Sequence, residues 1–515
     1  MNFKENYHYL IVLFLFLTIS FLFANFIGLD RHWTANYDHE FTLTYNALLF
    51  NNGKLIEYTQ HPGYFTILFL SLSFKLLSIF NFITVDKLSL LSAENFDHSF
   101  QSLIFYTRIY STICIAVFCS ATYALFYKFS KLKLYSYILS LLIFSSFGTI
   151  YHIAQLRTEL IAMFFVILSL ISLKIFFEEN SKFKFIHLCC FFLFSFCALL
   201  NKMQVFFFFP FLFLIFYFCE NKIEDFNIKE YNFLNKNWIP YVLFFIIIFY
   251  LYIENNTYYP FPFLSAAAVL FNLIIMNLFF FLLLRNNSKK IRVNLVVINL
   301  CFISIFFLLK SFLSMHPSTS PMLYTNLTRI MHSGMYIPNA PDIQNSTLLI
   351  SVLIEKLGTN FLTLMGNVVF KQNIYGILIT LNLLITVIFR KLLTTKIIKF
   401  NIACLIAAIF VMLINSYRSD GNIVSQYYIF SDLIIVLSFC SFSKVLKLKY
   451  LSIIFILTLY FTFQTSLEYV NSQKIPEVAT TNSNIKNVCK GTYFFDWQKK
   501  IDPKYFEDFC NEYLK

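Results

Sequence analysis

Charged residues are scarce in this chain. They make up 13% of the 515 residues, whereas 58% are hydrophobic and 69 are Phe. Glycine, Asn-Gly pairs and alternating apolar and polar stretches are too rare for an outer-membrane barrel. No soluble domain needs so much apolar surface, and long apolar runs recur along nearly the whole length. Since about 20 such residues span the hydrocarbon core as a helix, the composition predicts an all-α, polytopic integral membrane protein.

Counting the long apolar runs predicts about 13 transmembrane helices. They begin at Tyr9, Phe105, Leu134, Ile161, Phe185, Val205, Ile239, Phe261, Val293, Ile374, Ile402, Ile423 and Leu451. The first run has no small-residue cleavage site, so we interpret it as a retained helix and not as a signal peptide. Residues 1–466 are therefore predicted to form one transmembrane domain without internal repeats, followed by a small polar tail at 467–515.

The basic residues predict the orientation of the chain in the membrane. Four short loops, YKFSKLK, RNNSKKIR, RKLLTTKIIK and SKVLKLK, hold 14 Lys and Arg and no acid. Because Lys and Arg favour the cytoplasmic side, these loops and the N-terminus are predicted to be cytoplasmic. The formal net charge of +13 is thus a topology signal, and no nucleic-acid partner is expected.

This orientation requires that the apolar segment 64–80 does not cross the membrane. A short helix that contains Ser and Lys can lie in the interface instead, and an ordinary span with unevenly placed charges is the alternative. Residues 29–101, 311–372 and 467–515 are then the sizeable external segments. The Phe, Lys and Asn bias and the compact loops favour a bacterial inner membrane, with these segments on the periplasmic side.

Cysteine usage agrees with this topology. Nine of the 11 cysteines lie in hydrophobic segments, where a thiol is a small apolar side chain. Cys489 and Cys510 lie in the external tail and are predicted to form a disulfide there. No CxxC pair or histidine cluster accompanies them, and neither a metal nor another cofactor is expected.

One polar stretch interrupts the apolar sequence, and it reads NYDHEFTLTYNALLFNNGKLIEYTQHPG from Asn36 to Gly63. Asp38 and Glu40 come just after the first span. The next residues predict a short amphipathic helix that ends at Asn-Asn-Gly, followed by His-Pro-Gly and the interfacial helix. This order resembles the first external loop of the GT-C superfamily of polyprenyl-phosphate-sugar glycosyltransferases, in particular protein mannosyltransferases and the lipid A aminoarabinose transferase. Counting back from Gly53, the leading catalytic Asp of that family falls on Asp38.

Later segments match the same family in the same order. AQLRTELIAMFF resembles its Arg-Pro-Glu/Asp segment, with Thr158 in place of Pro. CALLNKMQVFFFFPF resembles its Leu-Leu-Thr-Lys segment, and SYRSDGNIVSQYYIFSDL loosely resembles its late Arg/Tyr loop. The matches cover most of the first 215 residues and a patch near Ser416, and the second half is otherwise weakly matched. Segment 311–372 lacks the acidic pair that some members have there, so no required metal is predicted.

The resemblance implies a membrane glycosyltransferase that moves a sugar from a polyprenyl-phosphate donor to a glycan, lipid or protein acceptor on the external side. An inverting transfer of this kind needs one carboxylate to take the proton of the acceptor hydroxyl. Asp38 is the predicted base and Glu40 its substitute. The alternative is that both are solvated acids at the start of a helix, where acids are favoured anyway.

The phosphate of such a donor needs cations, and Arg157, Lys202 and Arg418 are the basic residues in the short external loops. Arg can bind phosphate through two hydrogen bonds, whereas Lys acts as a point charge. Glu159 is predicted to orient Arg157 or to bind acceptor, and His61 to bind the sugar or phosphate. The alternatives are snorkelling at span ends for the cations and a structural turn for the histidine.

Three other classes of membrane protein remain open on the sequence. One is a purely structural membrane protein, which would not need Asp38 and the residues grouped with it. A polysaccharide polymerase or O-antigen ligase uses similar donors, with its chemistry in a large late external loop. A transporter of lipid-linked glycans is also polytopic, but typically has charged or broken helices at mid-membrane and repeat symmetry. Neither the sugar nor the acceptor follows from the residues.

Overall fold

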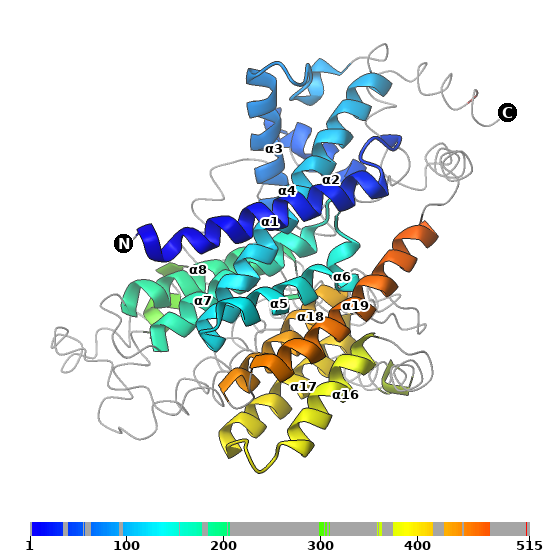
Figure 1. Cartoon of the computed structure of the whole chain (residues 1–515). Helices are drawn as coiled ribbons and strands as arrows, with labels where there is room; N and C mark the ends of the chain where they lie inside the picture. Colours follow the sequence, from blue (N-terminus) through cyan, green and yellow to red (C-terminus); the bar gives the residue numbers. More distant parts are fainter. Residues whose placement is uncertain are drawn as a thin grey trace, which may run out of the picture.

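The computed structural model describes residues 3–33, 40–54, 56, 63–91, 96–153, 155–177, 184–202, 204–205, 298–302, 304–305, 308, 358, 360–362, 374–415, 427–444, 448–473 and 511. Every regular element in these ranges is helical, and no strand occurs among them (Figure 1). The α-helices are α1 (Phe3–Ile27), α2 (Thr42–Asn51), α3 (Tyr64–Ile79), α4 (Phe96–Ser130), α5 (Lys133–Phe144), α6 (Phe147–Ile150), α7 (Thr158–Phe177), α8 (Lys184–Asn201), α16 (Ile374–Ile388), α17 (Thr395–Asn415), α18 (Tyr428–Phe439) and α19 (Leu448–Gln473). The all-α prediction is confirmed for this part of the chain.

Four described helices are long and apolar enough to cross a membrane. They cover Tyr7–Ile27, His98–Ser130, Thr158–Phe177 and Thr395–Leu413. The predicted spans that begin at Ile239 and Phe261 lie outside the described residues, so the count of 13 stays a prediction. Several of the other predicted spans are shorter apolar helices, among them α5 and α18.

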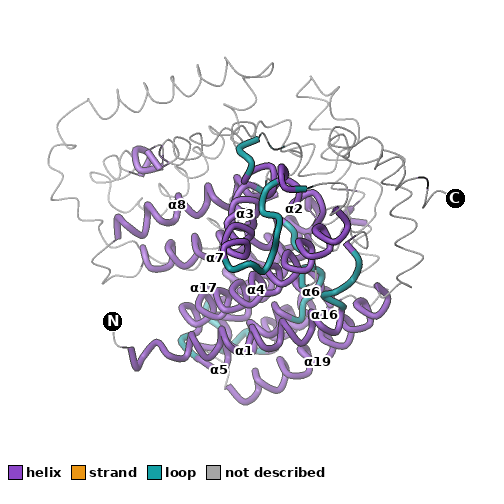
Figure 2. Tube along the Cα trace, turned by 90° about the horizontal axis from the view of Figure 1, so that it is seen from above, coloured by secondary structure: helices purple, strands orange, loops and turns teal. Residues whose placement is uncertain are grey.

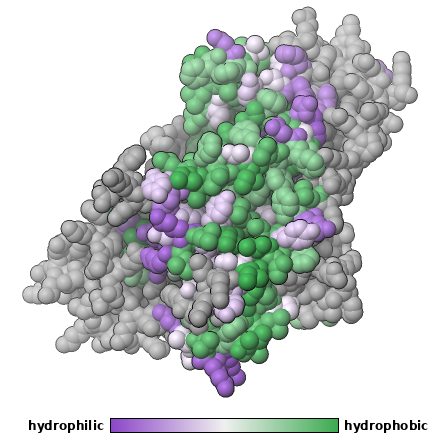
Figure 3. All heavy atoms as spheres, viewed as in Figure 1, coloured by the Kyte–Doolittle hydropathy of each residue, from purple (hydrophilic) through white to green (hydrophobic). Residues whose placement is uncertain are grey.

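The outer face of α1 is apolar and exposed. Leu10, Phe14 and Leu22 are 60%, 69% and 65% exposed, and Figure 3 shows a broad apolar surface on this side of the molecule. Monomeric soluble proteins rarely expose an apolar area of this extent. The face is what a helix in contact with lipid presents, in agreement with a membrane protein.

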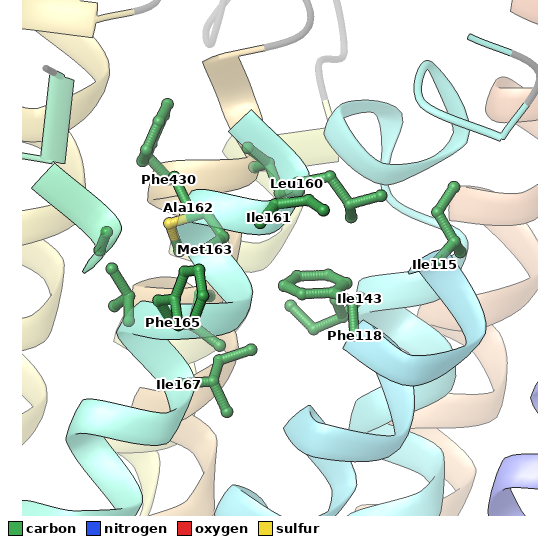
Figure 4. Packing of buried hydrophobic residues seen from close by; sticks show 14 of the residues in the cluster. Ile115, Phe118, Ile143, Leu160, Ile161, Ala162, Met163, Phe165, Ile167 and Phe430 are labelled. Carbon is green, nitrogen blue, oxygen red and sulfur yellow. The ribbon is translucent and has the colours of Figure 1, made fainter. Parts of the chain in front are cut away.

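Helix α7 lies inside the helical assembly. It packs on α4 and α8, and α17 packs on α18 (Figure 1). Figure 4 shows α7 side chains such as Ile161 and Phe165 in one buried hydrophobic cluster with Ile115 of α4 and Phe430 of α18. Arg157, just before α7, is therefore placed in the interior by the helix that follows it.

The predicted short helix of the first external segment is confirmed as α2. It ends where the sequence predicts, with Asn52 as its C-cap and Gly53 at a φ of 67°, a conformation that glycine adopts without steric cost. The helix is not amphipathic, however, because every residue from Thr42 to Phe50 is buried. It packs against α3, α4 and the 3₁₀ helix η3 (Leu88–Leu90), so that no side faces solvent.

The apolar segment after His-Pro-Gly forms helix α3. In Figure 1 this helix runs across the direction of α1, and Figure 2, from above, shows it nearly end-on while α1 runs across the view. A helix that lies along a membrane surface has this orientation if α1 crosses the membrane. The arrangement favours the interfacial assignment, which remains a prediction.

The predicted span at Leu134 is interrupted. Helix α5 stops at Phe144, and α6 restarts after Ser146, whose hydroxyl accepts a hydrogen bond from the Thr149 N–H. Gly148 of α6 lies directly against α18, since a Cβ there would be 2.3 Å from the Ile429 nitrogen. This contact fixes the start of α18 beside the segment that leads into α7.

The described cysteines are all free thiols, as their positions in apolar helices predict. They are Cys114, Cys119, Cys189, Cys190, Cys197, Cys301, Cys404 and Cys440. Cys489 and Cys510 lie outside the described residues, so their disulfide stays a prediction.

Two of these thiols provide a test of the helix packing. Cys189 and Cys301 are 112 residues apart in sequence, yet their Sγ atoms are 3.2 Å apart. We expect copper phenanthroline to link them in membranes, and peptide mapping without reductant to recover the pair. Cys190→Ser should leave the link intact, whereas Cys189→Ser should abolish it. A link through Cys190 instead would show a different rotation of α8.

Candidate functional site

Three predicted substrate-binding residues meet where α7 begins and α8 ends. The two helices pack side by side, which brings Arg157, just before α7, close to Lys202, just after α8. Lys202 Nζ lies 2.8 Å from Glu159 Oε1, and Arg157 Nε lies 3.5 Å from Glu159 Oε2. The predicted contact between Glu159 and Arg157 is therefore present, and Lys202 joins it.

This triad of Arg157, Glu159 and Lys202 is buried. The side chains of Glu159 and Lys202 have no exposed area, and that of Arg157 is 4% exposed. Two cations and one carboxylate leave a net charge of +1 in a place where charges are costly to desolvate. Aromatic rings flank the cations: Arg157 Cζ is 5.7 Å from the centre of the Tyr151 ring, and Lys202 Nζ is 5.2 Å from that of Tyr427. Neither Arg157 nor Lys202 extends its charged group to solvent, so the alternative of snorkelling at span ends does not fit these two side chains.

The first turn of α7 adds to the positive potential of the triad. The first four N–H groups of a helix have no partner within the helix, and its N-terminus bears a partial positive charge. Thr158 is 1% exposed, and its Oγ1 makes no hydrogen bond to the described part of the chain. Two buried cations beside a helix N-terminus form an environment that suits an anion.

Asn201 ties the first external segment to the triad. The Asn201 carbonyl oxygen accepts a hydrogen bond from the Gly63 N–H at 3.0 Å, and its side-chain Oδ1 accepts one from the Thr66 N–H at 2.9 Å. The Asn201 side-chain Nδ2 donates to the Thr158 carbonyl at 2.6 Å. The start of α3 is thereby held against the start of α7. Burial raises the pKa of Tyr64, in the same turn, from its ordinary value of 10 to about 12.

The structure places Glu40 in a separate buried ion pair. Its carboxylate accepts hydrogen bonds from Arg108 Nη2 at 3.1 Å and Nε at 3.2 Å, and neither side chain has any exposed area. Glu40 is therefore not a solvated acid at a helix start. Its carboxylate is held by a guanidinium, a geometry that suits a structural anchor better than a proton acceptor.

The other predicted site residues, Asp38, His61 and Arg418, lie outside the described residues. Asp38 follows the described segment 29–33 and precedes Glu40 by two positions, whereas His61 precedes the described Gly63 by two. Their predicted roles stay predictions.

Sequence reasoning missed three residues that the structure brings to these places: Arg108, Asn201 and Tyr427. Arg108 is a single Arg near the start of an apolar run. This position could have marked it as a residue with a buried partner, because ionisable residues in such runs are rare. The amide of Asn201 and the ring of Tyr427 had no signal beyond their place in the segments that resemble the family. Asp432 is also buried, and a Cβ on Gly148 would lie 2.8 Å from its Oδ2.

The function of the chain has to be inferred from the geometry of the triad and the Arg108–Glu40 pair. Comparison of the chain with protein-family models, curated proteins and solved structures finds no match. Among the described residues, no three His, Cys, Asp or Glu side chains form a group that could hold a metal ion.

Proposed function

We propose that the chain is a membrane glycosyltransferase that moves a sugar from a polyprenyl-phosphate donor to an acceptor hydroxyl on the external side. The supporting observation is the buried triad of Arg157, Glu159 and Lys202, which has a net positive charge at the N-terminus of α7 and is tied by Asn201 to the first external segment. A phosphate group is the part of such a donor that this environment suits.

In the proposed reaction the acceptor oxygen attacks the anomeric carbon of the donor sugar. The bond from that carbon to the phosphate oxygen breaks, and polyprenyl phosphate leaves with the bonding electrons. Asp38 takes the proton of the acceptor hydroxyl. Arg157 and Lys202 stabilise the negative charge that grows on the leaving phosphate, and Arg418 and His61 are further candidates for donor binding.

The proposal assigns Glu159 and Glu40 to positioning. Glu159 holds both cations of the triad, since its two carboxylate oxygens face Arg157 and Lys202 separately. Glu40 pairs with Arg108, so Asp38 is the acid of the first external segment to which we assign the proton transfer.

Transfer by the purified protein in detergent tests this function. The donors are radiolabelled polyprenyl-phosphate hexoses and pentoses, and a delipidated envelope fraction supplies the acceptors. We expect label to leave the lipid phase for the acceptor, with an equal amount of polyprenyl phosphate formed. Failure of all donors to react in both detergent and nanodiscs would contradict the proposal.

A transporter of lipid-linked sugars is the second candidate. Two observations favour it: the buried ion pair between Arg108 of α4 and Glu40, and the interruption between α5 and α6. Transport requires a sealed vesicle, whereas transfer does not. Movement of the labelled lipid across proteoliposomes without transfer in detergent would favour this candidate.

A further inference from the structure

Every N–H group of the Arg108 guanidinium donates a hydrogen bond to residues between Leu29 and Glu40. Nε and Nη2 donate to the Glu40 carboxylate. Nη1 donates to the carbonyl oxygens of Leu29, at 3.1 Å, and Arg31, and Nη2 also donates to that of His32 at 3.3 Å. A guanidinium has five N–H groups in a planar fork, and these contacts account for all five.

The acceptors of these bonds come from two places that are close in sequence. Leu29, Arg31 and His32 precede residues 34–39, and Glu40 follows them directly. Arg108 lies on another helix, α4, 68 residues from Glu40. One side chain therefore fixes both ends of the segment 34–39, which contains Asp38.

Gln101, two turns earlier on α4, binds the residues that precede position 34. Its Oε1 accepts a hydrogen bond from the Trp33 N–H at 2.8 Å. Its Nε2 donates to the carbonyl oxygens of Asp30 at 3.1 Å and Arg31 at 3.2 Å. Positions seven apart lie on one face of a helix, so Gln101 and Arg108 form a single anchor along α4.

Stability alone is a weak reason for such an arrangement. Replacing a buried ion pair with well-packed apolar side chains is often neutral or stabilising, because desolvation offsets the attraction. The guanidinium instead supplies geometry, since its directed hydrogen bonds hold Leu29, Arg31, His32 and Glu40 in a defined position relative to α4.

We infer that Arg108 is a positioning residue that, with Gln101, sets the placement of Asp38 for proton transfer. This inference rests on the proposed function. It assigns no contact with substrate to Arg108, and donor binding at the triad does not depend on it. Loss of the anchor should therefore lower kcat and leave the donor Kd and KM unchanged.

Two variants test the inference in the full-length protein. Arg108→Lys keeps the charge but has three donors without the planar fork. Gln101→Ala removes three hydrogen bonds at a partly exposed position, so it is the milder change. Misplacement by about 1 Å can cost on the order of 10²-fold in rate, and we expect a fall of that order in kcat for Arg108→Lys and a smaller fall for Gln101→Ala. Arg390→Lys, at an exposed position between α16 and α17, is the matched control.

Hydrogen–deuterium exchange provides a readout that does not depend on transfer. In both variants, amides of residues 29–33 and 40 should exchange faster than in the wild type, while α7 and α8 keep their exchange rates. Faster exchange with unchanged kcat would overturn the positioning role, and so would an equal rise in donor KM. If the wild type transfers no sugar, the positioning role fails together with the proposed function. Unchanged exchange would then also refute the anchor.

Discussion

Replacing Asp38 with Asn is expected to lower the rate of sugar transfer by about 10²- to 10⁴-fold, the usual cost of losing a general base. Asn has the shape of Asp but cannot take the proton of the acceptor hydroxyl. Donor binding should survive the change, because the phosphate is assigned to Arg157 and Lys202, which belong to other elements. Single-turnover transfer from a radiolabelled donor, with donor Kd measured in parallel, separates the two effects.

Asp30→Asn is the matched control for this variant. Asp30 is also an acid of the first external segment, but its side chain is exposed, and its replacement should leave the rate unchanged. Glu40→Gln should differ from both, because it leaves the buried Arg108 without its counter-ion. Such a loss typically costs about 3–5 kcal/mol of stability, and the melting temperature should fall with the rate. If Asp38→Asn and Glu40→Gln both retain full transfer, the first external segment is not catalytic, and the polymerase or ligase reading moves ahead.

Features set by local chemistry were predictable from the sequence. The end of α2 at Asn-Asn-Gly follows from the positive φ that Gly53 adopts. The start of α3 after His-Pro-Gly is equally local, with Gly63 as its N-cap at a φ of 53°. Apolar length predicted α1, α4, α7 and α17 as helices that can cross a membrane.

Features set by packing were not predictable. The pattern of Thr42–Phe50 indicated a half-exposed helix, but α3, α4 and η3 cover all of its faces. Two of its polar side chains have partners inside the molecule: the Thr44 and Thr107 hydroxyl groups form a hydrogen bond at 3.0 Å, and Asn51 Nδ2 donates to the Ser71 and Asp86 carbonyl oxygens. A polar side chain with such a partner can be buried without a large penalty.

In the candidate site, too, some features were predictable from the sequence and others depend on packing. The predicted topology puts Arg157 and Lys202 on the same side of the membrane. The 2.8 Å contact between Lys202 and Glu159 depends on how α7 and α8 are aligned against each other, which spacing along the chain does not reveal. Arg108 was missed because loop counting gives weight to basic residues between spans and none to an Arg within one.

The second large effect is a pair of opposite changes in donor affinity at the triad. Lys202→Met replaces the cation with an apolar side chain of similar length. The net charge of the triad then falls from +1 to about zero. Losing a charged hydrogen bond costs about 1.5–3 kcal/mol, so the donor Kd should rise by roughly 10- to 100-fold. Glu159→Gln removes the carboxylate that faces both Arg157 and Lys202. The donor Kd should then fall, because the phosphate no longer competes with Glu159 for the two cations.

The stability of these variants should follow the same electrostatics. Glu159→Gln leaves two like charges buried together, so its melting temperature should fall without ligand and recover when polyprenyl phosphate is added, since a ligand that binds the folded state stabilises it. Lys174→Met is the matched control: it removes a lysine in the last turn of the same helix, α7, where Nζ lies 5.4 Å from the centre of the Phe129 ring, and donor affinity should not change. If Lys202→Met and Glu159→Gln both weaken donor binding, and the added lipid stabilises neither, the triad is a structural ion-pair network, because only a bound anion makes the loss of a cation and the loss of a carboxylate act in opposite directions.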